Sequence, residues 1–353
     1  MRNQLENPDR WKVTILPLPK RMAFARVSGF CAGHLVGETE SRNGGSPTPH
    51  WWPDGRPVPI THPTQKRISV RRSSGDSIAG FWSRSGGGFG GACGWRFAGG
   101  ALELIDLHPG KDWDHTTAMG SGGGAFAGFG ERKAKKGERA VDVALFWRAD
   151  GTMVELPPAL EGQEVGAAAT DGAWVAGRAG GTGRQRAALW PADGSRLILL
   201  GEEQSLSEAF GVADGEQVGM LWTRKGSAAA LWRGDSASFT NLTPAGHQSG
   251  WACGCARGFQ VGHVQVSNTL RSGSGSMASK AAMWQGSAAS FIDLHALLPA
   301  PWNASSASAV EVRDGILRIA GDCTQFGVTN ELTPQESQYM IASQPVLWET
   351  PID

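Results

Sequence analysis

The chain has 353 residues, and its 33 lysines and arginines balance 33 aspartates and glutamates, so the formal net charge is zero at pH 7. This balance provides no global attraction to nucleic acid or to a membrane surface, and neither is expected as a partner. No run of residues approaches the roughly 18 apolar positions that a membrane-spanning helix needs.

The N-terminal region and the cysteines bear on cellular location. Residues 1–10 contain no apolar stretch of the kind found in a secretory signal. The five cysteines are an odd number without the spacing of a disulfide framework, which favours free thiols and a reducing compartment. A cytoplasmic location is therefore expected, with an extracellular one as the alternative if a signal peptide once preceded the chain.

The first predicted element is a strand at residues 11–18, within the segment from Trp11 to Pro19. It resembles the last strand of a repeat, but no other strand precedes it. Such a strand is expected to pair with a segment far away in the sequence, because an unpaired edge invites aggregation.

Seven tryptophans, each at the end of a short apolar run, then recur along the chain at spacings of 43, 52, 43, 42, 52 and 64 residues. Short strands with glycine boundaries and this period are typical of β-propeller blades. A large ring at the same place in every sheet suits packing between sheets, so we interpret these side chains as core, with sugar stacking as the alternative. The seven are Trp52, Trp95, Trp147, Trp190, Trp232, Trp284 and Trp348.

A second repeated feature is a β-run between two glycines. The first glycine is expected to close a hairpin with a positive φ, and the second to let the neighbouring backbone approach closely. The first glycines are Gly33, Gly75, Gly124, Gly172, Gly215, Gly258 and Gly315, and the second are Gly37, Gly80, Gly128, Gly177, Gly219, Gly262 and Gly321.

Together these features predict an all-β protein with one domain over residues 1–353, a seven-bladed β-propeller with four strands per blade. The last repeat has no fourth strand, so the strand at 11–18 is expected to complete it and close the ring. The predicted blades cover approximately residues 20–61, 62–107, 108–157, 158–201, 202–243, 244–295, and 296–353 together with 11–18.

The fifth repeat carries a family resemblance. Residues 209–219, Ala229 to Trp232 and Phe239 to Leu242 resemble the HAF repeat of bacterial, mostly extracellular proteins. The likeness is good in the fourth to sixth repeats, whereas the first, second and seventh match only at the glycine and tryptophan positions. The resemblance implies a propeller-like fold and brings no catalytic residues.

The loops between the second and third strands vary most in length, and insertions on one face usually mark the working face of a repeat protein. In repeats two to six these loops carry thirteen basic and three acidic residues. Such an excess favours an anionic small molecule or protein partner, although solubility alone is the competing explanation. The predicted ligand-binding residues are Arg84, Lys133, Lys135, Lys136, Arg184, Arg186 and Arg224.

Metal binding is a weaker hypothesis, and no metal site or cofactor is predicted. His62, His108 and His295 hold nearly equivalent repeat positions, which repetition explains better than coordination. His115 and His247 precede innermost strands and are the axis-facing candidates for copper or zinc. Cys253 and Cys255 are expected to share one face of an inner strand, where small buried thiols pack an axial channel, and no disulfide is expected.

Enzyme signatures are sparse. The single tyrosine, Tyr339, excludes a copper site with two tyrosine ligands, and no nucleophile elbow or phosphate-binding loop is present. The sequence thus favours a non-enzymatic binding or scaffolding propeller that acts through a basic, loop-rich face. A hydrolase or lyase in the axial funnel is the first alternative, with candidates Arg67, His115, Glu208 and His247, and a metal-binding propeller is the second.

Overall fold

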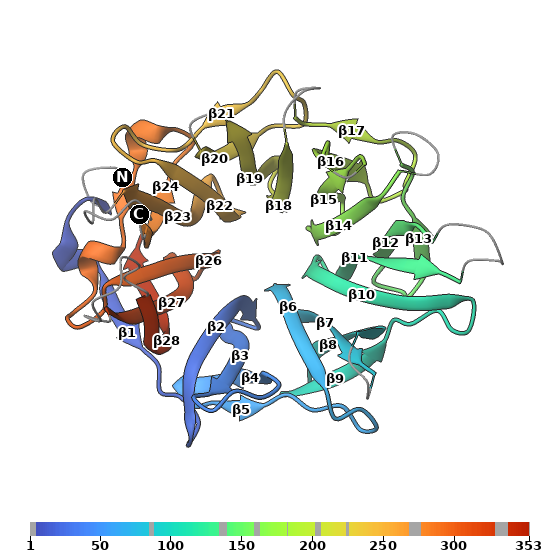
Figure 1. The fold of residues 1–353 in the computed structure, drawn as a ribbon, viewed down its shortest axis with the longest axis horizontal. Helices are drawn as coiled ribbons and strands as arrows, with labels where there is room; N and C mark the ends of the chain where they lie inside the picture. Colours follow the sequence, from blue (N-terminus) through green and yellow to red (C-terminus); the bar gives the residue numbers. More distant parts are fainter. Residues whose placement is uncertain are drawn as a thin grey trace.

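The computed structural model describes residues 5–84, 88–133, 140–158, 163–181, 183–201, 206–223, 226–267, 277–328 and 338–352. Seven antiparallel sheets of four strands surround a central axis, as the view along that axis shows (Figure 1). Single parallel pairs join the inner edges of the first three sheets, Gly29 with Ser73 and Arg72 with Gly120. The predicted seven-bladed propeller is confirmed.

Blades 1 to 6 run from an innermost to an outermost strand in chain order, whereas the outermost strand of blade 7 is the N-terminal β1. The strands are β2–β5 (Met22–Cys31, His34–Ser41, Thr48–Trp52, Val58–Pro59), β6–β9 (Ile68–Ser74, Ser77–Ser83, Phe89–Ala98, Ala101–Asp106), β10–β13 (Trp113–Gly122, Ala125–Arg132, Asp142–Trp147, Met153–Glu155), β14–β17 (Val165–Thr170, Trp174–Ala179, Arg186–Pro191, Ile198–Leu199), β18–β21 (Ser207–Ala213, Glu216–Thr223, Gly226–Trp232, Thr240–Asn241), β22–β25 (Ser249–Ala256, Phe259–Ser267, Met277–Trp284, Ile292–Asp293) and β26–β28 (Ala304–Arg313, Ile316–Val328, Gln338–Pro351) with β1 (Lys12–Ile15). Short 3-10 turns are η1 (Pro8–Arg10), η2 (Pro53–Gly55), η3 (Ala288–Ser290) and η4 (His295–Leu297). Among the described residues, no helix has the length and apolar character needed to cross a membrane.

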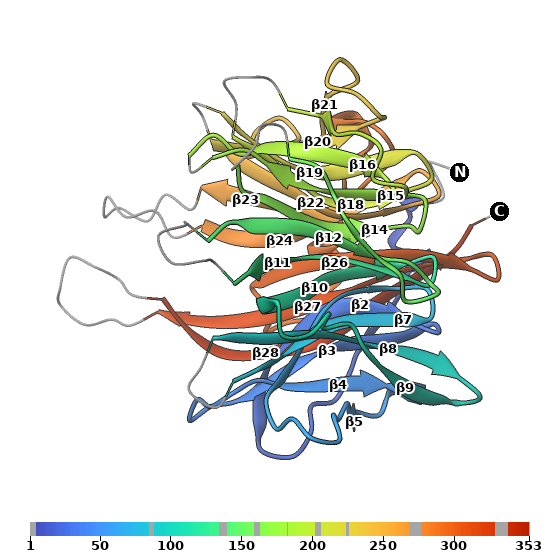
Figure 2. The same cartoon turned by 90° about the vertical axis from the view of Figure 1, so that its right-hand side faces the viewer.

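The N-terminal strand closes the ring as expected. β1 pairs antiparallel with β28, with Val13 opposite Trp348 and Ile15 opposite Val346. The backbone N–H of Leu16 extends the pairing by donating to the Pro345 carbonyl at 2.8 Å. Both chain ends therefore lie on the same side of the molecule (Figure 2).

The seven repeat tryptophans lie on the third strand of each blade and are at most 2 % exposed, which confirms that they are core residues. Four of them also connect neighbouring blades. The indole N–H of Trp190 donates to the carbonyl of Pro157, just after the outer strand of the preceding blade, at 2.9 Å. Trp52, Trp95 and Trp348 make the equivalent bond to Pro17, Thr61 and Leu294.

Both sets of repeat glycines have the predicted roles. The first glycine of every copy has a φ between 69° and 91°, the left-handed conformation that its hairpin requires. The second glycine lies against the innermost strand: a Cβ at Gly219 would lie 1.9 Å from the Glu208 carbonyl oxygen, and the other six would meet a backbone oxygen at 1.9–2.4 Å. Only a residue without a side chain lets the two strands come this close.

Candidate binding site in the axial channel

Every innermost strand carries a β-bulge at the same level of the channel, where it has one residue more than its partner strand. In β2, for example, Val27 pairs with Gly37 and Gly29 with Val36, so Ser28 lies between the pairs. A bulge changes the direction of a side chain and ends the regular alternation of the strand. The bulge residues, which we call the bulge ring, are Ser28, Arg71 with Arg72, Met119, Ala168, Phe210, Cys253 and Ser308.

Two cavities meet at the bulge ring. The upper chamber, about 870 Å³, lies toward the loops between second and third strands and is lined by blades 1, 2, 6 and 7. The lower chamber, about 160 Å³, lies toward the hairpins and is lined by the innermost strands of all seven blades. Ser28, Arg72, Cys253 and Ser308 line both chambers, so these bulge residues form the boundary between them.

Arg72 is the cation at this boundary. Its guanidinium carbon lies 5.2 Å from the ring centroid of Phe210, which comes from a blade across the axis, as the positions of β6 and β18 show (Figure 1). Within the described part of the chain, the Arg72 side chain has neither a hydrogen bond nor an ion pair. An arginine carries five N–H donors and stays charged, so this group can receive an anion without first losing a protein partner.

The neighbouring arginine is differently placed. The guanidinium of Arg71 lies 3.6 Å from Glu38 and 4.7 Å from the ring centroid of Phe81. Glu38 is itself fixed, because it accepts a hydrogen bond from the backbone N–H of Val70 at 3.0 Å. Arg71 therefore serves the packing of blades 1 and 2, and its charge is already compensated.

Asp322 and His263, which also line the upper chamber, have shifted pKa values. Burial raises the pKa of the Asp322 carboxyl to about 6, although the Ser306 hydroxyl donates to it at 3.1 Å and Arg26 favours its ionised form. Burial lowers the pKa of His263 to about 4, and its ring stacks on Trp251 with 4.9 Å between centroids. At neutral pH the chamber thus contains a carboxylate beside Arg26 and an uncharged imidazole.

The four funnel candidates have different surroundings. His115 lies 4.0 Å from Asp142, and Glu208 lies 3.5 Å from Arg178. The ring of His247 lies 5.3 Å from that of Phe291, and Arg67 accepts the backbone N–H of Ser83 through its carbonyl. None of the four is among the described residues that line either chamber. His115 and Glu208 lie within β10 and β18 and not before these strands as predicted, whereas Arg67 and His247 precede β6 and β22.

The predicted basic rim is only partly described. Arg84 donates to the Asp114 carbonyl, and Arg186 donates to that of Gly201 at 2.9 Å through Nε, so both already have oxygen partners. Lys133 and Arg184 are exposed. Lys135, Lys136 and Arg224 lie outside the described residues.

Two of the repeated histidines hold blades together, as repetition suggests. Nδ1 of His108 lies 2.9 Å from the Thr116 hydroxyl, which accepts the backbone N–H of Ala92 in the preceding blade. His295 and Ser305 repeat this arrangement at 2.9 Å. His62 instead accepts backbone N–H groups within its own loop.

The cysteines are free thiols, and both members of the Cys253–Cys255 pair line the lower chamber. Cys253 occupies the bulge of β22, so its position at the channel comes from the bulge and not from simple alternation with Cys255. Burial raises the pKa of the Cys253 thiol, which leaves it protonated at neutral pH.

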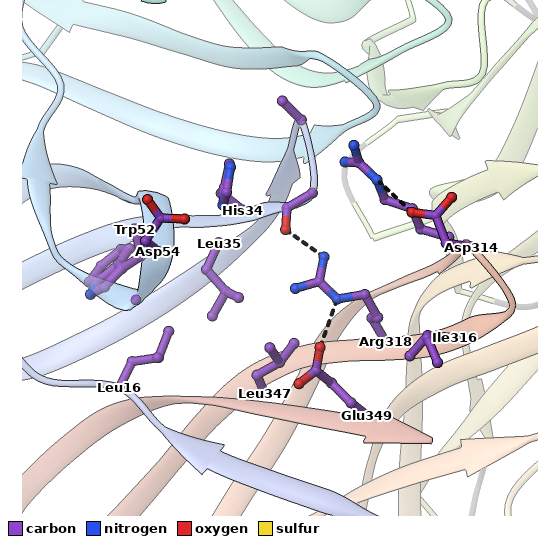
Figure 3. A pocket seen from close by; sticks show the side chains of 14 residues that line it. Leu16, His34, Leu35, Trp52, Asp54, Asp314, Ile316, Arg318, Leu347 and Glu349 are labelled. Carbon is purple, nitrogen blue, oxygen red and sulfur yellow. Dashed lines mark hydrogen bonds and ion pairs between the residues drawn. The ribbon is translucent and has the colours of Figure 1, made fainter. Parts of the chain in front are cut away.

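A separate pocket of about 450 Å³ lies at the seam between blades 7 and 1, over apolar side chains that include Leu16, Leu35 and Leu347 (Figure 3). Its central cation, Arg318, is bound by Glu349 at 3.0 Å and by Glu311 at 2.7 Å, and it also donates to the Gly33 carbonyl. Because these contacts join blade 7 to the first hairpin of blade 1, we interpret Arg318 as part of the ring closure.

Solved structures with similar folds belong to larger proteins. The chain is 14 % identical to a puromycin hydrolase, with a TM-score of 0.57, and the match covers 92 % of this chain and 54 % of that one. It is 14 % identical to a prolyl endopeptidase (TM-score 0.53; 96 % and 51 % covered) and 11 % identical to the acylaminoacyl peptidase of Pyrococcus horikoshii (TM-score 0.50; 90 % and 52 % covered). The chain thus spans about half the length of these proteins.

At such low identity the likeness shows the β-propeller fold alone. No protein-family model and no curated protein matches the chain. The HAF resemblance of the central repeats therefore stays a prediction.

Proposed function

We propose that this protein is a binding propeller that holds an anionic ligand at the bulge ring, with Arg72 as its principal contact. The observation that carries the proposal is the Arg72 guanidinium, which lies on the boundary of both chambers, over the Phe210 ring and without a described oxygen partner. Stacking on an aromatic ring holds the planar group in place, which reduces the entropy lost when an anion binds.

The surroundings favour a ligand of modest size. The upper chamber, at about 870 Å³, has the volume of typical small-molecule sites. Hydroxyl groups of Ser28 and Ser308 line it and can donate hydrogen bonds to a carboxylate or phosphate. The anion belongs either to a small molecule or to a segment of a partner protein narrow enough to enter the chamber. Exposed rim cations such as Lys133 and Arg184 would steer it toward the opening.

Binding is favoured over catalysis by the state of the nearest nucleophile. Cys253 lies at the ring with Arg72, yet its thiol is protonated because burial raises its pKa. A thiol in this state is a poor nucleophile, since the thiolate is the reactive form.

The test uses citrate and inorganic phosphate as probes in isothermal titration calorimetry. Arg72→Met removes the charge and leaves an apolar chain against Phe210, so it should weaken binding by about tenfold to a hundredfold, the usual worth of a hydrogen bond to a charged group. Arg132→Met is the matched control, because Arg132 also lies over an aromatic ring, at 4.7 Å from Trp113, but on the rim.

Three outcomes are informative. Loss of binding in Arg72→Met with normal binding in Arg132→Met supports the axial site. Binding that survives Arg72→Met but is lost in a Lys133→Glu, Arg184→Glu double variant would move the site to the rim loops. Absence of saturable binding for both probes would contradict the proposed function.

A further inference from the structure

Blade 3 brings together a histidine and several carboxylates that the axial site does not use. Asp114 and His115 in β10 and Glu131 in β11 place one ligand atom each within 4.8 Å of one another. Asp142 in β12 adds a carboxylate oxygen 4.0 Å from Nε2 of His115. The imidazole is 15 % exposed, so it lies largely buried among these groups.

The strand register explains why these side chains meet. His115 pairs directly with Glu131, and Glu131 pairs directly with Asp142. Residues directly opposite each other on neighbouring strands project from the same face of a sheet, so the three form a row across blade 3. An irregularity between Trp113 and His115 takes Asp114 out of the alternation, which brings it to the same row.

Repetition does not account for this cluster. Glu131 lies three residues after the second glycine of its repeat. Blade 1 has Glu40 at this position, but Glu40 pairs with Phe24 and not with a histidine. The corresponding residues of the other blades are Ser83, Gly180, Trp222, Gln265 and Thr324. The cluster is thus particular to blade 3, unlike His108 and His295, whose contacts recur from blade to blade.

The cluster also concentrates negative charge. Glu164, from blade 4, adds a further negative charge near Asp142. Among the described residues, Arg84, half exposed and 3.5 Å from the Asp114 carboxylate, and Arg178 lie beside the cluster. Lys135, Lys136 and Arg139, in the loop between β11 and β12, lie outside the described residues. A divalent cation held by these carboxylates would offset their negative charge.

We propose that blade 3 binds one divalent transition-metal ion, Mn²⁺ or Zn²⁺, through His115, Asp114 and Glu131, with Asp142 as a fourth ligand. Imidazole nitrogen with carboxylate oxygens is a ligand set that these metals accept. Ligands on a tetrahedral ion lie about 3.4 Å apart at bond lengths of about 2.1 Å, so the side chains need only small rotations to close around it. The site is independent of Arg72.

The experiment titrates untagged, chelator-treated protein with Mn²⁺ and with Zn²⁺, followed by calorimetry and, for Mn²⁺, electron paramagnetic resonance. One equivalent should bind per chain. His115→Ala and Glu131→Gln should each weaken binding by at least about tenfold, because substitutions even one shell beyond the ligands cost that much. Arg84→Met should keep or tighten the affinity, since it removes a competing cation.

Two controls isolate the cluster. Glu155→Gln removes a carboxylate from the neighbouring strand β13, where it pairs with Arg132, and should leave metal binding unchanged. Cys253→Ser tests whether zinc instead binds a thiol of the channel, a ligand that Mn²⁺ does not favour. Arg72→Met should also have no effect, so failure of the anion site and failure of the metal site are distinguishable.

Either of two results would overturn the metal site. If neither metal binds saturably, or if binding is unchanged in both His115→Ala and Glu131→Gln, His115 and Asp142 form only an ion pair and the proposal is wrong. Melting curves accompany each variant, and the nearly isosteric Glu131→Gln decides the question if His115→Ala fails to fold.

Discussion

Asp322 illustrates how the upper chamber changes the chemistry of a single residue. The folded protein holds its pKa at about 6 because the carboxyl is buried, whereas an unfolded chain would have a value near 3.9. Between these two pH values the folded state binds more protons than the unfolded state. This group therefore lowers the free energy of unfolding as pH rises from about 4 to about 6, and the loss persists above that range.

In the Asp322→Asn variant, the amide oxygen can still accept the hydrogen bond from the Ser306 hydroxyl, but the side chain does not ionise. Melting temperatures measured at pH 4.5 and pH 7.5 should show that the variant gains stability relative to the natural protein at the higher pH. Other titrating groups are common to both proteins and cancel in the comparison. Parallel changes in the two proteins would contradict the buried position of this carboxyl.

At the residue scale, the sequence predicts the packing residues better than the site. A tryptophan that recurs at one place in every repeat has to be explained by packing, and all seven are buried. Arg72 gave no such signal, because its position at the axis depends on one extra residue in β6. Cys253 was expected at the channel, and it is the bulge of β22 that places it there.

At the scale of the strands, the second glycine of each repeat is what permits the bulge beside it. Gly219 pairs with Ala209, the residue immediately before the Phe210 bulge. A methyl group at Gly219 would lie 1.9 Å from the Glu208 carbonyl oxygen, a contact that the backbone can relieve only by moving β18 away from β19.

Gly219→Ala should therefore destabilise the protein by about 1–3 kcal/mol, the usual cost of overpacking. It should also weaken the binding of any ligand that contacts Phe210. Urea denaturation measures the first effect. Gly181→Ala is the control: no heavy atom lies within 4 Å of the position that its methyl group would take, and the change should be close to neutral. Equal stability of the two variants would show that the close contact is relieved without cost.

The strand pattern itself could be predicted from the sequence, and the bulges could not. Glycine spacing and hairpin turns have residue preferences that repeat seven times, so each copy supports the others. The bulge positions hold serine, arginine, methionine, alanine, phenylalanine and cysteine. Because these residues share no chemical property, their common place in the backbone leaves no pattern to recognise.

For the molecule as a whole, the closing strand determines whether the ring has a free edge. Without residues 1–19, β28 would keep β27 but lose its outer partner along the segment from Val346 to Glu349. The truncated protein should melt at lower temperature and aggregate as its concentration rises, since an unpaired strand edge can pair with another chain.

Differential scanning calorimetry and light scattering test this expectation. Lys12→Ala is the control, because it removes only an ion pair with Glu349 at 3.4 Å in which the lysine is 76 % exposed. Exposed ion pairs of this kind contribute at most about 1 kcal/mol to the free energy of unfolding. A truncated protein that stays monomeric with unchanged melting would show that β1 is dispensable.

The bulge ring has a consequence for how such a molecule can acquire new specificity. Bulge residues of blades 1, 2, 5, 6 and 7 line the chambers, and regular strand pairing continues on either side of each bulge. Ser28, Cys253 and Ser308, which line both chambers, could thus be exchanged for other side chains while Arg72 stays in place. A ligand preference set at these bulge positions, each in a different blade, would be able to change stepwise while the architecture stays the same.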